Sequence, residues 1–140
     1  MQWQTDWTAS DNYAQGNVED VERILLNYQA IADMSTEFFG IPITLISIAL
    51  SKYSTMPFAD FLNDIEHNLQ QIRQWAASWI GTQTAWSPAA PAPNADDINR
   101  WEQNGQAAEA GIVNAANWSV FCGIASAGQG RLYQQRFRRR

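Results

Sequence analysis

The string Ile-Asn-Arg-Trp-Glu-Gln-Asn at residues 98–104 recurs as Leu-Asn-Asp-Ile-Glu-His-Asn at residues 62–68, with both Asn, the Glu and two apolar positions kept. A third and more divergent copy, Val-Glu-Arg-Ile-Leu-Leu-Asn, occupies residues 21–27 and keeps the apolar positions and the final Asn. A unit that recurs along a chain indicates a fold assembled from equivalent supersecondary pieces. The repeat therefore constrains the architecture before any question of chemistry arises.

Each copy continues downstream in the same apolar register, at offsets of three, seven and about ten from its first residue. This spacing places the apolar side chains on one face of a helix. Three such faces can be buried against one another at a shallow crossing angle, so the sequence predicts a mainly α protein built as a three-helix bundle. The stripe residues are Ile24, Tyr28 and Ile31; Ile65, Leu69, Ile72 and Trp79; and Trp101, Gly105, Ala108 and Ile112.

Helix signals flank the first two copies. Asn17 can cap a first helix over about residues 18–34, because its side-chain oxygen can accept from amides of the first turn. Pro57 suits the first turn of a second helix, which is expected to run to about Ile80 and to stop at Gly81.

The third copy has its own signals. Asn94 and Asp97 form a box-like cap, and the helix is expected to end near residues 114–117. Gly105 and Gly111 each weaken a helix by about 1 kcal/mol relative to Ala, unless close packing requires a small residue. We take them to indicate tight contact with a neighbouring element.

The remaining segments are short and non-helical in this interpretation. Residues 82–93 read as a stiff Pro-containing linker, and residues 118–137 as Gly-containing turns or a short hairpin. Residues 41–50 fit either a buried strand or an extended crossing segment, which periodicity does not distinguish. The chain is expected to be one domain over residues 1–137, with repeats near 7–34, 53–80 and 86–117 and a basic tail at 138–140.

Charge is distributed unevenly. The formal net charge is -5, but residues 1–130 hold four basic and fourteen acidic groups, whereas residues 131–140 hold five Arg. An acidic body repels nucleic acid and anionic membranes, so nucleic acid is not an expected partner. The longest apolar stretch is too short to span a membrane, and no secretory signal is visible, so synthesis in a bacterial cytoplasm is expected.

Catalytic and metal-binding patterns are weak. His67 and Cys122 are each the only residue of their kind, which argues against a His or thiolate metal site and against a disulfide within the chain. Asp96 and Asp97 lie at a helix start, where acids stabilise the helix dipole. We therefore expect no enzyme activity, no catalytic residue, no metal and no cofactor.

The polar positions of the repeat are interpreted as structural. The Asn at offset six is adjacent to the apolar stripe, where its amide can hydrogen-bond the backbone of a neighbouring segment. The Glu at offset four flanks the stripe and can pair with an Arg or accept from an amide. The structural motif residues are Asn27, Asn63, Glu66, Asn68, Asn99, Arg100, Glu102 and Asn104.

The pattern of an aromatic residue, a turn and an apolar-Asn-Arg-apolar-Glu-x-Asn helix resembles a motif repeated in tail and baseplate structural proteins of phages and prophages of Gram-positive bacteria. Trp7, Tyr53 and Trp86 are the aromatic residues upstream of the three copies. Phe-Cys-Gly at 121–123 and Ala-Gly-Gln-Gly at 127–130 are similar to the Gly-rich closing segment of such proteins. Two departures stand out: Asp64 replaces the Arg of the pattern, and Leu25 replaces its Glu.

The resemblance implies a structural or adaptor subunit of a tail, baseplate or fibre, located in the virion and acting through contacts with other virion proteins and with copies of itself. The alternative is a carbohydrate-binding module that attaches to a host cell-surface glycan through loop aromatics. The candidate partner-binding residues are Trp3, Trp7, Trp86, Arg136, Arg138, Arg139 and Arg140.

Overall fold

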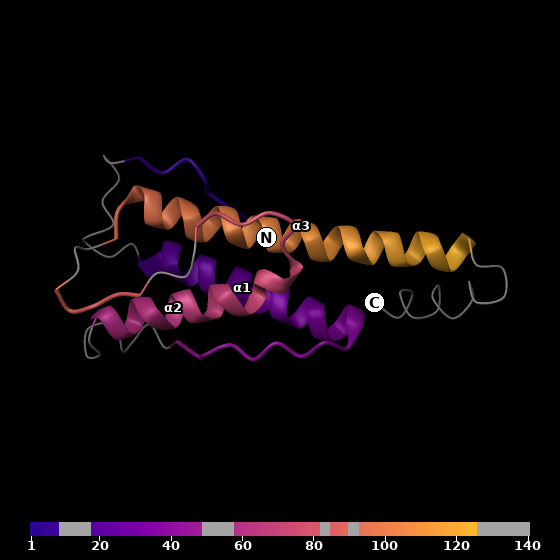
Figure 1. The fold of residues 1–140 in the computed structure, drawn as a ribbon, viewed down its shortest axis with the longest axis horizontal. Helices are drawn as coiled ribbons and strands as arrows, with labels where there is room; N and C mark the ends of the chain where they lie inside the picture. The colour runs from indigo at the N-terminus through magenta and orange to yellow at the C-terminus, as the bar shows by residue number, and fades with distance from the viewer. Residues whose placement is uncertain (9–17, 49–57, 82–84, 90–92, 126–140) are drawn as a thin grey trace.

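Three α-helices form the framework of the chain in a computed structural model (Figure 1). The structure describes residues 1–8, 18–48, 58–81, 85–89 and 93–125, and within these ranges no β-strand is present. The mainly α class is therefore confirmed. The elements are α1 (Val18–Phe39), α2 (Phe58–Ile72), the 3-10 turn η2 (Arg73–Trp75) and α3 (Ala95–Ala125).

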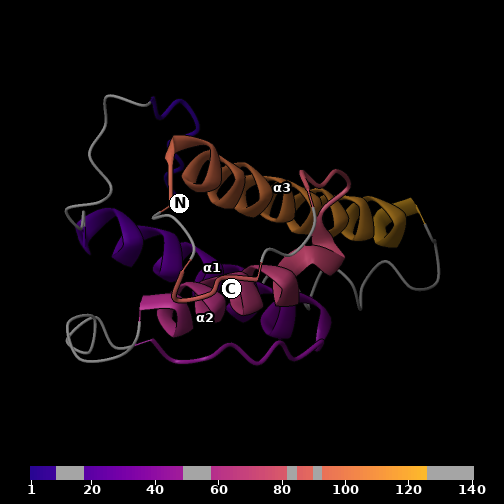
Figure 2. The same cartoon turned by 60° about the vertical axis from the view of Figure 1, so that its left-hand side comes forward.

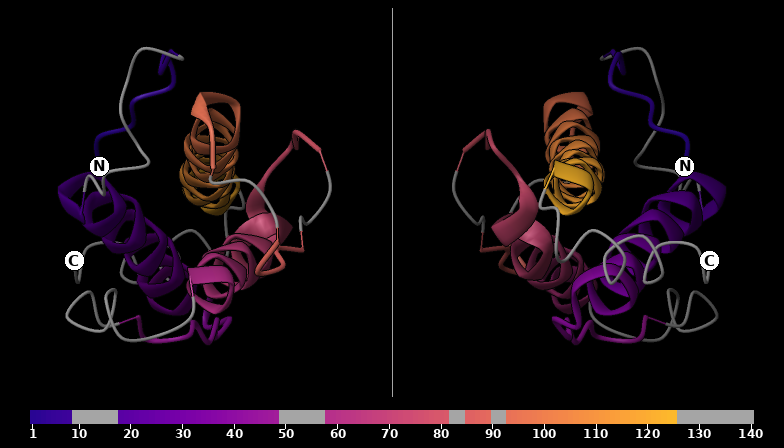
Figure 3. Two further views of the ribbon diagram at one scale, coloured as in Figure 1. Left: turned by 90° about the vertical axis from the view of Figure 1, so that its left-hand side faces the viewer. Right: turned by 90° about the vertical axis from the view of Figure 1, so that its right-hand side faces the viewer.

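The three helices contact one another pairwise and form a bundle. Turning the molecule shows α3 lying across the pair α1 and α2 (Figure 2), and an end-on view places the three at the corners of a triangle (Figure 3). α3 is the longest of them and continues past the ends of the other two (Figure 1). The bundle core lies along α3 from Ala95 as far as Ala116, and the last turns of the helix continue beyond it.

The core consists of the apolar stripes of the repeat. The sequence-based assignment of these faces to the interior is confirmed, since almost every stripe residue is buried. They are Ile24, Tyr28, Ile31, Ile65, Leu69, Ile72, Trp101, Ala108 and Ile112, with Trp79 partly buried beyond the end of α2.

α1 begins at Val18 as expected but continues to Phe39, beyond the expected end near residue 34. Phe39 stacks on Trp75, with ring centroids 4.8 Å apart, so the added turn is held by tertiary packing. The helix stops at Gly40, whose φ of +65° is readily adopted only by glycine, and the Gly40 N–H donates to the carbonyl of Thr36 at 2.9 Å.

α2 ends at Ile72, so the expectation of a helix to about Ile80 is wrong. After the short turn η2 the chain is no longer helical, and Asn104 of α3 binds both backbone polar groups of Ile80. Tertiary hydrogen bonds have replaced the helical ones. Gly81 adopts a φ of +72° within this non-helical stretch and does not cap a helix.

α3 starts with the expected reciprocal cap, because Asn94 N–H donates to Asp97 Oδ2 and Asp97 N–H donates to Asn94 Oδ1, each at 3.0 Å. The expected end near residues 114–117 is wrong, and so are turns over 118–125, since the helix reaches Ala125. Residues 110–125 contain no Pro, so no residue there removes a helical amide. The rest of the predicted turn region, 126–137, lies outside the described residues.

Tight contact at the glycines of α3 is confirmed. A Cβ built on Gly111 would lie 1.6 Å from the carbonyl oxygen of Trp75, and one on Gly105 would lie 2.5 Å from the ring of Trp3. At Gly111 the close neighbour is backbone, which cannot turn aside as a side chain can. Glycine here allows α3 to lie directly against η2.

Residues 41–48 form an extended segment without strand pairing, which favours the crossing segment over the strand for this part of residues 41–50; residues 49 and 50 lie outside the described ranges. None of the helices in the described ranges combines the length and apolarity that crossing a bilayer requires.

Candidate functional site

Asparagine side chains of the repeat hold the extended segments of the chain against the helices. We call a clasp an Asn whose side-chain oxygen accepts from the N–H, and whose side-chain nitrogen donates to the C=O, of one backbone residue. Such a pair satisfies both backbone polar groups as a neighbouring β-strand would. The clasps are Asn63 on Trp86 (2.8 and 2.9 Å), Asn68 on Ile46 (2.7 and 2.9 Å), Asn99 on Trp7 (2.9 and 2.9 Å) and Asn104 on Ile80 (2.8 and 3.0 Å).

Two parts of the chain are each held by Asn residues from two copies of the repeat. Ile80 is clasped from α3 and Trp86 from α2, on either side of residues 82–84, which lie outside the described part of the chain. The N-terminal segment is arranged equivalently, since Asn27 of α1 donates to the carbonyl of Gln2 at 2.6 Å and Asn99 of α3 clasps Trp7. Each segment thus ties two helices together, and the predicted backbone-binding role of the offset-six Asn residues is confirmed.

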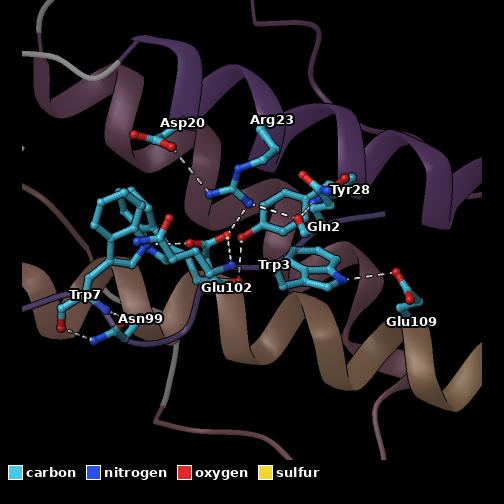
Figure 4. Close-up of polar contacts among 12 residues, drawn as sticks. Gln2, Trp3, Trp7, Asp20, Arg23, Tyr28, Asn99, Glu102 and Glu109 are labelled. Atoms are coloured by element: carbon cyan, nitrogen blue, oxygen red, sulfur yellow. Dashed lines mark hydrogen bonds and ion pairs between the residues drawn. The ribbon is translucent and has the colours of Figure 1, made fainter.

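Glu102 is the centre of the polar cluster on the N-terminal segment (Figure 4). Its side chain is fully buried, and it accepts hydrogen bonds from Arg23 Nη1, from the indole nitrogen of Trp7 and, at 3.0 Å, from the backbone N–H of Gln4. A buried carboxylate is stable only when its oxygens are paired in this way. Glu102 therefore joins α1, α3 and the N-terminal segment.

Glu66 has the same role in the neighbouring copy. It accepts from both terminal nitrogens of Arg100, from the indole nitrogen of Trp101 at 2.7 Å and from that of Trp86 at 3.3 Å. The carboxylate is again almost completely buried. The two clusters follow one rule, in which the offset-four Glu of one helix receives an Arg from offset two of the next and a Trp from an extended segment.

The two departures from the repeat pattern, Asp64 and Leu25, both fall on the third helix pair, α1 and α2. In the cycle of pairings, offset two of α1 joins offset four of α3, and offset two of α3 joins offset four of α2. The third pairing would join offset two of α2, which is Asp64, to offset four of α1, which is Leu25. Both halves of the ion pair are replaced there, so no Arg is left without its Glu, and the carboxylate of Asp64 is only half-buried.

The protonation equilibria reflect these pairings. The hydrogen bond and charge of Glu102 raise the pKa of Arg23 above its ordinary value. Burial lowers the pKa of Arg100, but the hydrogen bond and charge of Glu66 outweigh it, and the pKa is raised. Burial, reinforced by the charge of Glu66, raises the pKa of Tyr28 well above its ordinary value.

The three candidate partner-binding Trp residues pack inside this framework. Trp7 and Trp86 donate their indole N–H groups to Glu102 and Glu66, and Trp3 donates to Glu109 Oε2 at 3.0 Å. All three are only partly exposed, so the structure uses their rings to hold the extended segments. Arg136, Arg138, Arg139 and Arg140 lie outside the described residues.

Replacing Asn104 by Ala is expected to lower the free energy of unfolding by about 1–3 kcal/mol, because two buried hydrogen bonds to Ile80 are lost. Urea denaturation measures the cost, and hydrogen exchange at the Ile80 amide is expected to accelerate. Gln103→Ala is the matched control, since its side chain makes a single 3.4 Å bond to Thr5. Equal effects of the two substitutions would contradict the clasp.

The raised pKa of Tyr28 predicts alkaline instability. Above a pH of about 10 the unfolded chain releases the phenolic proton while the folded chain retains it, so stability falls as the pH rises toward the folded pKa. Tyr28→Phe loses the 2.9 Å hydrogen bond to the Trp101 carbonyl, which costs about 1 kcal/mol at neutral pH, but it also removes this titration. Urea denaturation from pH 8 to 11 should show the difference between the two proteins narrowing; parallel curves would refute the prediction.

Sequence reasoning missed several contributors. Arg23 was not among the motif residues, although its alignment with Arg100 at offset two marks it as an ion-pair partner. Glu109 and Tyr28 were also missed as hydrogen-bonding partners of the segments and helices. No repeat position signals Glu109, because it lies beyond the copied string.

Within the described ranges, no group of three or more His, Cys, Asp or Glu side chains is placed to hold a metal ion. Comparison with known proteins returned no match among family models, curated proteins or solved structures.

Proposed function

We propose that this protein is a structural or adaptor subunit of a phage or prophage tail, baseplate or fibre, and that it acts through protein contacts. The proposal starts from the repeated motif, which resembles that of phage tail and baseplate proteins. It would place the protein in the tail of the virion after synthesis in the bacterial cytoplasm.

The observation that carries the proposal is the use of the motif's own polar residues. Glu66 and Glu102 are about 1 % and 0 % exposed, and each is bonded to an Arg and to Trp side chains of the same chain. Groups that act on a substrate must reach it. Here they fasten extended segments to helices, which is the chemistry of a scaffold.

The shape of α3 also supports a role in assembly. The helix extends beyond the bundle (Figure 1), and residues 110–125 contain no charged side chain. Val113 on this stretch is 40 % exposed. An uncharged helical projection offers a surface on which neighbouring subunits can pack.

Particle purification tests the proposal. We expect an epitope-tagged chain, produced in its source bacterium during prophage induction, to co-sediment with tail-like particles and to be labelled on the tail by immunogold microscopy. Ile65→Asp, which is expected to unfold the bundle, serves as the control for non-specific sedimentation. Particles that lack the protein, and that form normally when its gene is deleted, would refute the proposal.

A further inference from the structure

An open groove lies between α1 and the extended residues 45–48, on the helix pair that lacks the Glu–Arg pairing. Its volume is about 370 Å³. Most of its wall is apolar, from Leu25, Leu26, Leu45 and Ile48, and Leu26 is 62 % exposed. A solvent-exposed Leu at the rim of an apolar groove is a common feature of surfaces that bind another segment.

The repeat indicates what kind of side chain fits this groove. At the two other helix pairs, the offset-four position is a Glu that accepts from the indole N–H of Trp7 or Trp86. Here the same position is Leu25, which cannot accept a hydrogen bond. The aromatic residue upstream of the second copy, Tyr53, lies outside the described residues, and a ring in this groove would find no acceptor at Leu25 for a polar hydrogen.

The side of α1 at the groove is acidic. Glu22 lines the groove, and Glu19 and Asp33 are exposed on the same side of α1, each seven residues from Leu26. The one basic side chain of α1, Arg23, is committed to Glu102. An extended segment that combines an aromatic ring with positive charge would complement both features.

The C-terminal part of the chain provides such a segment. Residues 131–140 read Arg-Leu-Tyr-Gln-Gln-Arg-Phe-Arg-Arg-Arg, and they place Phe137 between Arg136 and Arg138. We propose that the groove beside Leu26 binds Phe137 and its flanking arginines from a second copy of this protein. The ring would occupy the apolar groove while the guanidinium groups pair with the carboxylates on this side of α1.

The geometry favours a second copy over the same chain. The groove is on the turn of α1 next to Arg23, which contacts Glu102, and α3 runs from Glu102 to Ala125 for about 35 Å at 1.5 Å per residue. The twelve residues from Ala125 to Phe137 span at most about 40 Å fully extended. Its own tail would reach the groove only with almost no slack, whereas a neighbour's tail has no such limit.

A tail bound in the groove of another copy is a head-to-tail contact. Such contacts generate rings or open filaments, because each copy offers one tail and one groove. The inference deepens the proposed function by naming a partner, and it rests on that function only in assuming that the protein works through protein contacts.

Light scattering on the full-length protein tests the inference. We expect concentration-dependent self-association, weakened when salt rises from 0.1 to 1 M because the screening length falls from about 10 to about 3 Å. Leu26→Asp should raise the dissociation constant at least tenfold, as should Phe137→Ser combined with Gln at Arg136, Arg138, Arg139 and Arg140. Ile41→Asp is the matched surface control, since its side chain is 39 % exposed and does not line the groove, and it should leave self-association unchanged.

Mixing the two defective proteins gives the sharper result. One retains a tail and the other retains a groove, so the mixture is expected to form a one-to-one heterodimer although each protein alone is monomeric. A wild-type chain that stays monomeric, or self-association unaffected by Leu26→Asp, would overturn the inference. So would a lower melting temperature for Leu26→Asp with unchanged association, because that result would mean that a segment of the same chain fills the groove.

The two proposals fail separately. If the protein is present in tail particles but does not self-associate through the groove, only the present inference is wrong. If it forms heterodimers on mixing but is absent from the particles, only the phage assignment is wrong.

Discussion

Replacing Ile65 by Asp is expected to abolish the cooperative unfolding transition and to leave a chain without a stable bundle. Ile65 is about 1 % exposed at the centre of the core cluster. Loss of its packing alone costs about 2–5 kcal/mol, and an unpaired carboxylate adds several more. The sum is comparable to the whole stability of a domain of this size, about 5–15 kcal/mol.

Circular dichroism during heating measures the effect. Ile80→Asp is the matched control, because the Ile80 side chain is 48 % exposed while its backbone remains held by Asn104. The control is expected to melt cooperatively near the wild-type temperature. A soluble Ile65→Asp protein with a sharp melting transition would contradict the assignment of the repeat stripe to the core.

The parts of the fold that the sequence predicts are those set by local periodicity. Ile24, Ile65 and Trp101 occupy offset three of their copies, and all three are buried in one cluster. The cap of Asn94 and Asp97 also depends only on nearby residues. Both patterns act within a few turns of one helix, so they can be read without knowing what the helix contacts.

The parts that the sequence did not predict depend on distant partners. α2 stops at Ile72 because the following chain is bound by α3, and the backbone of Ile80 is recognised by a residue 24 positions later. The length of α3 was missed for the opposite reason, since nothing in residues 118–125 ends a helix. The end of α2 therefore follows from tertiary contacts, whereas α1 ends and α3 begins at cap residues.

The sequence predicted what the polar residues of the candidate site do, but not which residues they pair with. The sequence indicated that Asn104 would bind backbone, which is confirmed, and that Glu102 would pair with an Arg or accept from an amide; Glu102 does both, with Arg23 and with the N–H of Gln4. It did not indicate that Glu102 pairs with Arg23 of the first copy while Arg100 pairs with Glu66 of the second. These partners can be assigned only when the order of the helices around the bundle is known. The same order shows that Leu25 and Asp64 fall on one helix pair.

Replacing Glu102 by Leu is expected to lower the free energy of unfolding by about 3–5 kcal/mol. The substitution leaves Arg23, the indole of Trp7 and the N–H of Gln4 without their acceptor. The apolar side chain itself is not the difficulty, because Leu25 occupies the equivalent position of α1. The cost comes from the partners that remain.

The second substitution, Arg23→Leu, separates these contributions. When it is added to Glu102→Leu, the double variant is expected to be more stable than Glu102→Leu alone by about 1–3 kcal/mol, because it removes a guanidinium that would keep only the Gln2 carbonyl and Asp20 as partners. Full recovery is not expected, since Trp7 and Gln4 still lack their acceptor and residues 1–8 should exchange amide hydrogens faster. Urea denaturation of the wild type, both single variants and the double variant completes the cycle. If the two losses of free energy of unfolding were strictly additive, the buried pair of Arg23 and Glu102 would not couple α1 to α3. The absence of such a pair between α1 and α2 would then cost no stability.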